Sequence, residues 1–139
     1  MRLVVLVGLP GSGKSTYLKQ AGTTGLSSDA IRLWLADDET DQTIRYLLRH
    51  RLSLGRPVTC IDATNLTPAE RAPYIGIGRS YGCELEAVFF DTPLDVCRAR
   101  NTGRTRVVPD DALVKLAERL VPPTLDEGFD RVTVISLPL

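Results

Sequence analysis

The sequence predicts an α/β domain built on a parallel β-sheet with helices on both faces. Short apolar segments rich in β-branched residues alternate along the chain with segments of helical periodicity, which is the pattern of βαβ units. The apolar segments are unbroken rather than alternating with polar residues, as expected for strands that are buried on both faces. The length of 139 residues suits a single domain with one sizeable core.

The first half of the chain begins with an apolar strand. Leu3–Val7 is an unbroken run rich in valine, and a glycine ends it. A short helix is predicted over about residues 14–21, and the stretch TTGLSS at 23–28 is a weak candidate for a further strand. Apolar residues at helical spacing predict a helix with a basic outer face over Asp41–Leu54. VTCID at Val58–Asp62 then has the signature of a second buried strand.

The helix expected after this second strand has a defined start. Thr67 is followed by Pro68 in the first helical turn and by Glu70 in the position that completes a capping box. Pro73 should kink or shorten the same helix, because proline removes a backbone hydrogen bond and clashes with the preceding turn.

The second half of the chain continues the alternation. LEAVFFD at Leu85–Asp91 is the third buried strand, and TPLD signals another helix start with Asp95 in the carboxylate position. A helix with leucines on one face is predicted over Asp110–Leu120, and RVTVIS at 131–136 is the last strand.

Composition narrows the range of functions. The formal net charge is zero, so no global field attracts the chain to nucleic acid or to an anionic membrane, and a polyanion would need a local cluster of basic residues. Cys60, Cys83 and Cys97 are widely spaced and odd in number, which argues against a disulfide framework or a zinc site and predicts buried thiols. The N-terminal apolar run is too short for a signal peptide or a membrane span. We therefore expect a cytoplasmic protein with no membrane partner.

A phosphate-binding motif follows the first strand. GLPGSGKST at 8–16 matches G-x-x-x-x-G-K-S/T between a buried strand and a helix, which is the context that this motif requires. Its glycines let successive N–H groups face a phosphate, Lys14 reaches the β- and γ-phosphates, and Ser15 can coordinate Mg²⁺. ATP or another nucleoside triphosphate is thus the predicted ligand. The residues predicted to bind it are Gly8, Gly11, Ser12, Gly13, Lys14, Ser15 and Thr16.

SSDAIR at 27–32 places a carboxylate and an arginine one helical turn apart. Asp29 falls at the carboxyl edge of the predicted sheet, where parallel sheets bind ligands. Taken alone it would be a helix N-cap, but beside a phosphate-binding loop it suits the task of accepting a proton from an attacking hydroxyl. Arg32 is either a surface residue that pairs with Asp29 or a group that holds an anion on the acceptor molecule.

CRARNTGRTR, near the end of the chain, carries four arginines around a glycine. Arg98 is as consistent with a solvated helix face as with a site. Arg100, Arg104 and Arg106 flank the glycine, where a loop could close over phosphates and neutralise developing charge. These three arginines are therefore candidates for a short lid.

Other polar features have a structural and a functional interpretation. Asp62 and Asp91 also follow buried strands; Asp62, in the stretch DATN, either orients Mg²⁺ as a Walker-B aspartate does or forms an Asx-type turn. The carboxylates of the acidic stretch ADDETDQ at 36–42 are expected to stabilise the positive N-terminal end of the helix that follows. His50 lies in a basic stretch and is expected to be an exposed helix residue.

Together these motifs resemble the 5′-hydroxyl polynucleotide kinases. The likeness is carried by GLPGSGKST, SSDAIR, DATN with Arg71 soon after it, CRARNTGRTR and the late EGFDRVTVI. The acidic spacing after Arg32 and RLSLGRPV before the second strand extend it over nearly the whole chain, although Ala36 stands where the family pattern has serine. The closest likeness is to the kinase module of bacterial polynucleotide kinase-phosphatase end-healing enzymes and its phage relatives. The phosphate-binding loop alone does not distinguish among kinases and ATPases. SSD-x-x-R together with the arginine lid narrows the resemblance to the polynucleotide kinases.

The resemblance implies a P-loop kinase sheet with the donor and acceptor sites at its two ends. On the donor side, the resemblance implies that Lys14 and Ser15 would bind the ATP phosphates and Mg²⁺, while the position of Asp62 after a buried strand would let it orient Mg²⁺ through water. Arg100 and Arg104 would be lid residues on the ATP phosphates.

On the acceptor side, the resemblance makes Asp29 the general base on the 5′-hydroxyl. Arg32 would hold the phosphate on the 3′ side of the terminal nucleoside, and Arg106 would be a third, substrate-binding residue of the lid.

One departure from the bacterial enzymes affects the expected role. There the kinase module is joined to phosphatase or ligase parts, whereas we expect a single kinase domain over residues 1–139. Either it is a stand-alone kinase that works with separately encoded phosphatase or ligase partners, or it uses another acceptor. The favoured function is transfer of the ATP γ-phosphate to a 5′-hydroxyl end of DNA or RNA. A small-molecule kinase and an ATPase or NTP-binding switch are the alternatives.

Overall fold

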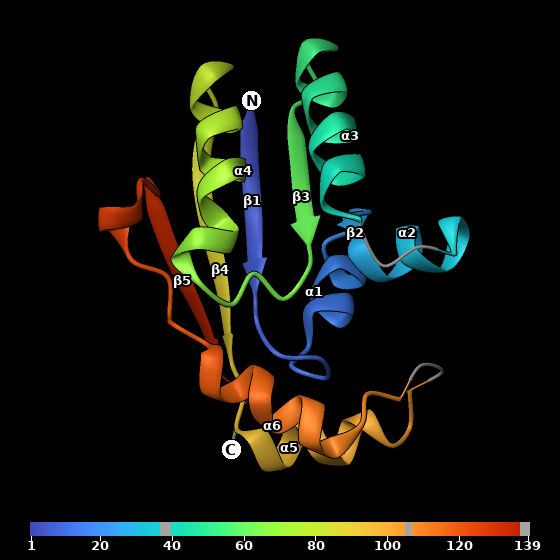
Figure 1. Cartoon of the computed structure of the whole chain (residues 1–139). Helices are drawn as coiled ribbons and strands as arrows, with labels where there is room; N and C mark the ends of the chain where they lie inside the picture. The colour runs from blue at the N-terminus through green and yellow to red at the C-terminus, as the bar shows by residue number, and fades with distance from the viewer. Residues whose placement is uncertain (37–39, 105–106, 137–139) are drawn as a thin grey trace.

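The computed structural model describes residues 1–36, 40–104 and 107–136 of the chain. At its centre is a five-stranded parallel sheet in the order β2-β3-β1-β4-β5 (Figure 1). The α/β fold predicted from the sequence is confirmed, and the weakly indicated strand is present as the short edge strand β2. The strands are β1 (Arg2–Val7), β2 (Leu26–Ser27), β3 (Val58–Asp62), β4 (Glu84–Asp91) and β5 (Arg131–Ser136).

Strand β1 is hydrogen-bonded to β3 on one side and to β4 on the other. Its alternate side chains serve two separate cores: Leu3 and Val5 pack on one face of the sheet, and Val4 and Leu6 pack on the other. All four are at most 2% exposed. Burial on both faces explains why the sequence of this strand is an unbroken apolar run.

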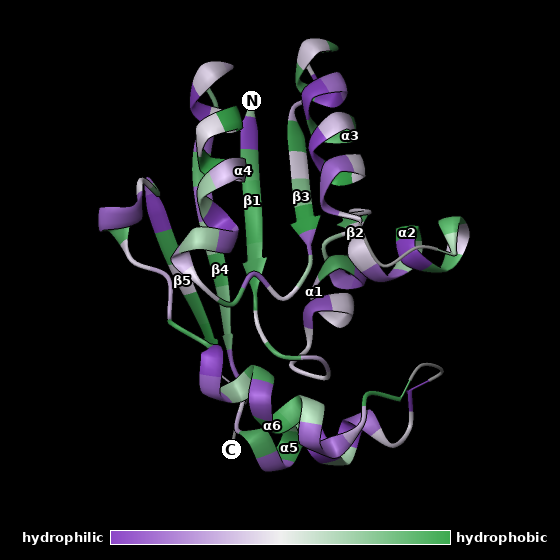
Figure 2. Cartoon of the chain, in the orientation of Figure 1, coloured by the Kyte–Doolittle hydropathy of each residue, from purple (hydrophilic) through white to green (hydrophobic). Residues whose placement is uncertain are grey.

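Helices cover both faces of the sheet and its carboxyl edge (Figure 1). Helices α3 and α4 pack on one face and α1 packs on the other, while α2 projects beside β2. The pair α5 and α6 lies beyond the carboxyl ends of the strands, where it forms a third apolar cluster. Figure 2 shows that β1, β3 and β4 are mostly hydrophobic, whereas the helices carry hydrophilic residues as well. The helices are α1 (Lys14–Gln20), α2 (Ser28–Leu35), α3 (Asp41–Ser53), α4 (Pro68–Ser80), α5 (Leu94–Asn101) and α6 (Asp110–Arg119).

Helix α4 is not shortened by its internal proline. It continues through Pro73 to Ser80 as one α-helix. The residues that follow the proline include Tyr74, Ile75 and Ile77, which are all buried in the larger apolar core. Tertiary packing therefore outweighs the local cost of the proline.

Two of the predicted helix starts differ in detail from the expected capping. Thr67 caps α4 by accepting from the N–H of Glu70, but the Glu70 carboxylate accepts from the N–H of Leu66 instead of that of the cap residue. The reciprocal half of the capping box is thus displaced by one residue.

At TPLD no side chain caps α5, and the Thr92 hydroxyl instead donates to the Ser12 carbonyl at 2.9 Å. This bond ties the start of α5 to the phosphate-binding loop.

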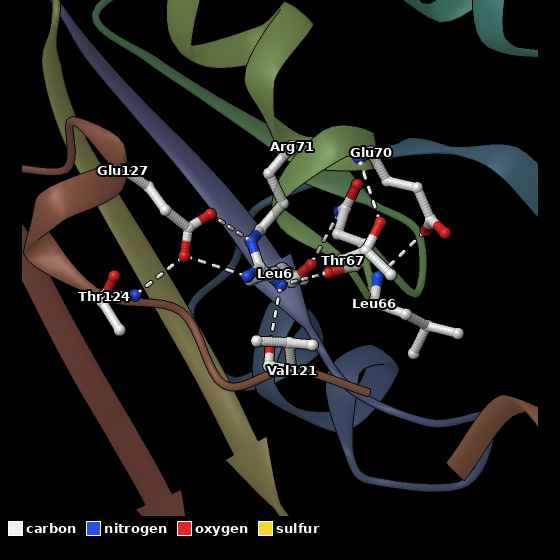
Figure 3. A network of polar contacts seen from close by, with 9 residues as sticks. Leu6, Leu66, Thr67, Glu70, Arg71, Val121, Thr124 and Glu127 are labelled. Atoms are coloured by element: carbon white, nitrogen blue, oxygen red, sulfur yellow. Dashed lines mark hydrogen bonds and ion pairs between the residues drawn. The ribbon is translucent and has the colours of Figure 1, made fainter. Parts of the chain in front are cut away.

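A buried arginine joins the start of α4 to the segment before β5 (Figure 3). Arg71 is fully buried, and its guanidinium donates to the two carboxylate oxygens of Glu127 at 2.8 and 2.9 Å. The same group donates to the carbonyls of Asn65 and Val121 at 2.8 and 3.0 Å. Glu127 also accepts from the N–H of Thr124. The network therefore holds the segment between α6 and β5 against the loop between β3 and α4.

The three cysteines are free and buried, as their spacing predicts. Burial raises the pKa of each thiol, which disfavours the reactive thiolate and suits a structural role. Within the described ranges, no helix has both the length and the apolar composition needed to cross a membrane.

Candidate active site

An open cleft of about 1470 Å³ lies at the carboxyl edge of the sheet. It brings together the phosphate-binding loop, the start of α2, the end of β3 and the segment after α5. Gly8 and the exposed Asp91 do not line it, and Arg106 falls outside the described residues. The predicted site residues that do line it are Gly11, Ser12, Gly13, Lys14, Ser15, Thr16, Asp29, Arg32, Asp62, Arg100 and Arg104.

The phosphate-binding loop depends on its glycines. Gly11 (φ 82°) and Gly13 (φ 112°) have left-handed backbone conformations that other residues rarely adopt. A Cβ at Gly8 would come within 2.5 Å of the Ser12 hydroxyl oxygen, and one at Gly11 would come within 3.0 Å of the Cys97 carbonyl oxygen. Side chains at these positions would therefore distort the loop and the contact between the loop and α5.

The cradle formed by this loop fits a triphosphate. The Ser12 hydroxyl is buried and has no hydrogen-bond partner in the described part of the chain. Lys14 Nζ donates to the carbonyls of Gly8 and Leu9 at 2.7 and 2.9 Å. Burial lowers the pKa of Lys14 to about 8, although the nearby Asp62 carboxylate opposes the shift. An unpaired hydroxyl and a desolvated ammonium are groups that phosphate oxygens would satisfy.

Asp62 ends β3 at the floor of the cleft. Burial raises the pKa of its carboxyl, and Lys14 opposes this shift. Gly25 leaves room for it, because a Cβ there would come within 2.8 Å of the Asp62 Cβ. Mg²⁺ in kinase sites is held by one or two protein oxygens together with phosphates and water, so Ser15 and Asp62 would suffice. No cluster of three or more His, Cys, Asp or Glu side chains is present among the residues described.

Asn65 shapes the DATN segment after β3. Asn65 has a left-handed backbone (φ 47°), and its Nδ2 donates to the carbonyls of Leu6 and Ala63 at 2.7 and 3.4 Å. The N–H of Gly8 donates to the neighbouring Thr64 carbonyl at 3.0 Å. This loop therefore holds the first residue of the phosphate-binding motif in place.

Asp29 is not the cap of α2. Ser27 is the N-cap, and its hydroxyl accepts from the N–H of Ala30 at 3.1 Å. Asp29 lies in the first turn, where its carboxylate accepts from Arg32 Nη1 at 2.8 Å and from Arg104 Nη2 at 3.4 Å. Arginines from two different segments therefore meet at one carboxylate inside the cleft, and Arg32 takes the ion-pair position that the sequence allowed.

The candidate lid reaches the cleft from α5 and from the loop after it. Arg100 Nη1 donates to the Gly11 carbonyl at 3.3 Å, next to the phosphate-binding loop. Arg104 Nη1 is buried and lacks a hydrogen-bond partner within the described ranges. Arg98, in contrast, pairs with Asp110 at 2.8 Å and does not line the cleft. The interpretation of Arg98 as a residue on a solvated helix face therefore agrees with the structure.

Residues that position the site were overlooked in the sequence. Asn101 is buried, and its side chain bonds the N–H and the carbonyl of Val108 at 3.0 and 2.6 Å, which closes the loop that carries Arg104. The available signal for Asn65 and Asn101 was chemical, because asparagine bonds nearby backbone groups and tolerates left-handed conformations. Apolar side chains that also line the cleft are Leu33, Phe90, Val108, Leu116 and Ile135.

Comparison with known proteins agrees with this geometry. The sequence model of the AAA_33 family, described as an AAA domain, matches residues 3–123. The chain belongs to this family. With its parallel sheet and phosphate-binding loop, this AAA_33 chain has the α/β P-loop kinase fold.

Individual relatives of the AAA_33 chain differ in their acceptors. A curated L-seryl-tRNA(Sec) kinase from Methanococcus maripaludis is 22% identical over 145 residues, which cover 92% of this chain and 56% of that protein. The chain thus spans little more than half the length of this relative. A gluconokinase from Sinorhizobium meliloti 1021 has a TM-score of 0.64 and 20% identity over 97% of this chain and 82% of its own. A fungal RNA kinase has a TM-score of 0.71 and 19% identity over 99% of this chain and 38% of its own. At these identities the two structures share the fold.

Proposed function

We propose that this AAA_33 kinase transfers the γ-phosphate of ATP to the 5′-hydroxyl of a DNA or RNA end. The observation that carries the proposal is the meeting of Asp29, Arg32 and Arg104 in the cleft that also contains the phosphate-binding loop. A carboxylate, an anion-binding guanidinium and a lid arginine are the groups that activate an acceptor hydroxyl, anchor it and neutralise transition-state charge.

On the donor side, Lys14 and the N–H groups of the loop would hold the triphosphate, and Ser15 and Asp62 would hold Mg²⁺. The bound nucleotide and metal supply the transferable phosphoryl group and part of the charge neutralisation. Arg100 is next to the loop through its bond to the Gly11 carbonyl, and one nitrogen of Arg104 has no hydrogen-bond partner among the residues described. Both guanidinium groups would bind phosphate oxygens as negative charge develops on them.

On the acceptor side, the 5′-hydroxyl oxygen would attack the γ-phosphorus while Asp29 accepts the proton of that hydroxyl. Arg32 would hold the phosphate on the 3′ side of the terminal nucleoside. Both arginines that bond the Asp29 carboxylate would thus gain a substrate anion, Arg32 from the acceptor and Arg104 from ATP. When the two arginines leave Asp29 to bind these anions, a carboxylate oxygen of Asp29 becomes free to accept the proton.

The relatives support more than one acceptor class. The RNA kinase favours a polynucleotide acceptor, the L-seryl-tRNA(Sec) kinase acts on an aminoacylated RNA, and the gluconokinase represents the alternative of a small hydroxyl compound. In an end-healing role, separately encoded phosphatase or ligase partners would carry out the remaining steps.

The test is transfer from γ-labelled ATP in Mg²⁺ to a 5′-hydroxyl oligonucleotide, its 5′-phosphorylated twin, or no acceptor. We expect label on the 5′-hydroxyl strand alone. Inorganic phosphate released equally in all three reactions would contradict the proposal and favour an ATPase switch. If the assay showed no transfer and no release, nucleosides and sugars would be the next acceptors to test.

A further inference from the structure

A second cavity adjoins the candidate acceptor site. Its volume is about 450 Å³, and it lies between the starts of α2, α3 and α4. Ser28, Arg32, Ala63 and Thr64 line both this cavity and the main cleft. The two spaces therefore meet at Arg32, where the proposed function places the first phosphate of the acceptor.

The wall of the second cavity carries a guanidinium with unused hydrogen-bonding capacity. Arg45 Nη2 pairs with the Asp41 carboxylate at 2.5 Å, while its Nε is buried and has no hydrogen-bond partner among the residues that the structure describes. Asp41 also accepts from the Tyr74 hydroxyl at 2.8 Å, and Glu70, the other carboxylate of the wall, pairs with Arg119. Arg45 is thus the cationic partner of Asp41 and Arg119 that of Glu70, and the Nε of Arg45 remains as a donor for an incoming anion.

The exposed side of α3 extends this chemistry away from the cavity. Arg45 and Arg49 are four residues apart, as are Tyr46 and His50, so each pair shares a face of the helix. Tyr46 is 68% exposed, and its ring is nearly parallel to that of His50, with an angle of 5° and centroids 6.3 Å apart. We refer to Arg45, Tyr46, Arg49 and His50 as the α3 stripe.

Charge on α3 is one-sided. Asp41, which Arg45 neutralises, is the only acidic residue in the helix. Arg49 is exposed, and no acidic residue of α3 lies one turn from it. Exposed aromatic rings interleaved with arginines are the combination that holds single-stranded nucleic acid, through base stacking and phosphate contacts.

We propose that the second cavity and the α3 stripe bind the acceptor strand beyond its first phosphate. Resting on the proposed function, this inference defines the substrate class as a single-stranded polynucleotide of several nucleotides. The phosphate after the one at Arg32 enters the second cavity and bonds Arg45. The bases that follow stack on Tyr46 and His50, and Arg49 pairs with the next phosphate. Because the chain has no net charge, a polyanion has to be attracted by local groups of basic residues, and the α3 stripe is one of them.

The test compares a 5′-hydroxyl dinucleotide with a single-stranded 5′-hydroxyl octanucleotide. KM for phosphoryl transfer is measured in the native chain and in Tyr46→Ala, Tyr46→Phe and Arg49→Gln. Lys115→Gln is the matched control, since it removes an exposed positive charge from α6. Turnover of the dinucleotide reports in the same assay whether each variant is folded.

In the native chain we expect a lower KM for the octanucleotide than for the dinucleotide. Tyr46→Ala should raise the octanucleotide KM about fivefold or more, the scale of one lost base stack, whereas Tyr46→Phe should keep it. Arg49→Gln should reduce the slope of log affinity against log salt by about 0.7, the value for one single-strand phosphate. The dinucleotide KM should stay unchanged in all variants, and Lys115→Gln should change neither KM.

Three results would overturn the inference. Equal KM values for the two acceptors in the native chain, or equal losses with both in the variants, would leave the proposed function standing and remove the α3 stripe from it. A blunt duplex accepted as well as the single strand, with no effect of Tyr46→Ala, would also exclude a single-strand track. Transfer to neither acceptor is a different result, because it would contradict the proposed function itself.

Discussion

Arg71 and Arg104 each pair with a carboxylate from a distant part of the chain, but in different surroundings. Arg71 is fully buried and makes four hydrogen bonds, two to Glu127 and two to backbone carbonyls. Arg104 reaches Asp29 through a contact of 3.4 Å, and the Asp29 side chain is 49% exposed. One nitrogen of Arg104 makes no hydrogen bond in the described part of the structure.

Saturation and burial separate the roles of these two clusters. Four of the five N–H donors of Arg71 are used within the described part of the fold, and removing its charge would leave a nearly buried carboxylate unpaired. The bonds between Asp29 and its arginines are partly solvated and can be exchanged for bonds to phosphate at little cost. The same residue types thus fix the fold in one place and present an exchangeable site in the other.

The largest effect is expected from breaking the Arg71 cluster. Arg71→Met should lower the free energy of unfolding by about 3–5 kcal/mol, because Glu127 and two carbonyls lose their donor inside the protein. Asn65, which receives one of these bonds, in turn donates to Leu6, so the phosphate-binding loop should loosen as well. Urea denaturation followed by circular dichroism measures the change.

The control for this variant is Arg98→Met, which removes an exposed ion pair with Asp110. This substitution should lower the free energy of unfolding by less than about 1 kcal/mol. Similar losses in both variants would show that burial does not distinguish the two kinds of pair.

The next effect concerns the carboxylate of the exchangeable cluster. Asp29→Asn should lower the rate of phosphoryl transfer by roughly 10²-fold or more, the scale of a lost general base, while ATP affinity stays nearly unchanged. Single-turnover kinetics and nucleotide titration separate the two quantities. Asp91→Asn is the matched control, because Asp91 is an aspartate at the end of strand β4 that lies outside the cleft lining. A wild-type rate in Asp29→Asn would make Asp29 a structural residue.

Arg32 should act on one class of acceptor only. Arg32→Gln is expected to weaken an acceptor with a 3′-phosphate by about 1.5–3 kcal/mol, the range for a hydrogen bond to a charged group, and to spare an acceptor without that phosphate. Steady-state KM values for a nucleoside 3′-phosphate and for the plain nucleoside measure the difference. Equal losses with both acceptors would indicate an arginine that only supports Asp29.

The smallest effect is the pH dependence of ATP binding through Lys14. Its pKa of about 8 lies below the ordinary value for lysine, because the ammonium is buried. Triphosphate oxygens would stabilise the charged form and raise this pKa in the complex. ATP affinity should therefore be highest below pH 8 and should fall above it, by at most about tenfold per pH unit. Calorimetry in two buffers of different ionisation enthalpy should show proton uptake above pH 8, and Lys14→Met should abolish it.

Features that depend on neighbouring residues were predictable from the sequence alone. The apolar strands, the phosphate-binding loop with its glycines and the α3 boundaries all follow from short-range periodicity and turn chemistry. The fold class follows from their order along the chain, because strands that alternate with helices form parallel sheets. The same logic placed Asp29, Asp62 and the loop at one edge of the sheet.

Tertiary structure decided which polar groups pair. The bonds from Arg71 to Glu127, from Asn65 to Leu6 and from Arg104 to Asp29 join residues that are 56, 59 and 75 positions apart. No local pattern specifies such partners, because the distance between them is set by how the helices pack on the sheet. The choice of Ser27 as the helix cap is local, because its hydroxyl accepts from Ala30 three residues on, whereas the bond between Asp29 and Arg104 required the fold. Local sequence thus determined the elements and the chemistry available at the sheet edge, and packing determined which side chains became structural and which remained exchangeable.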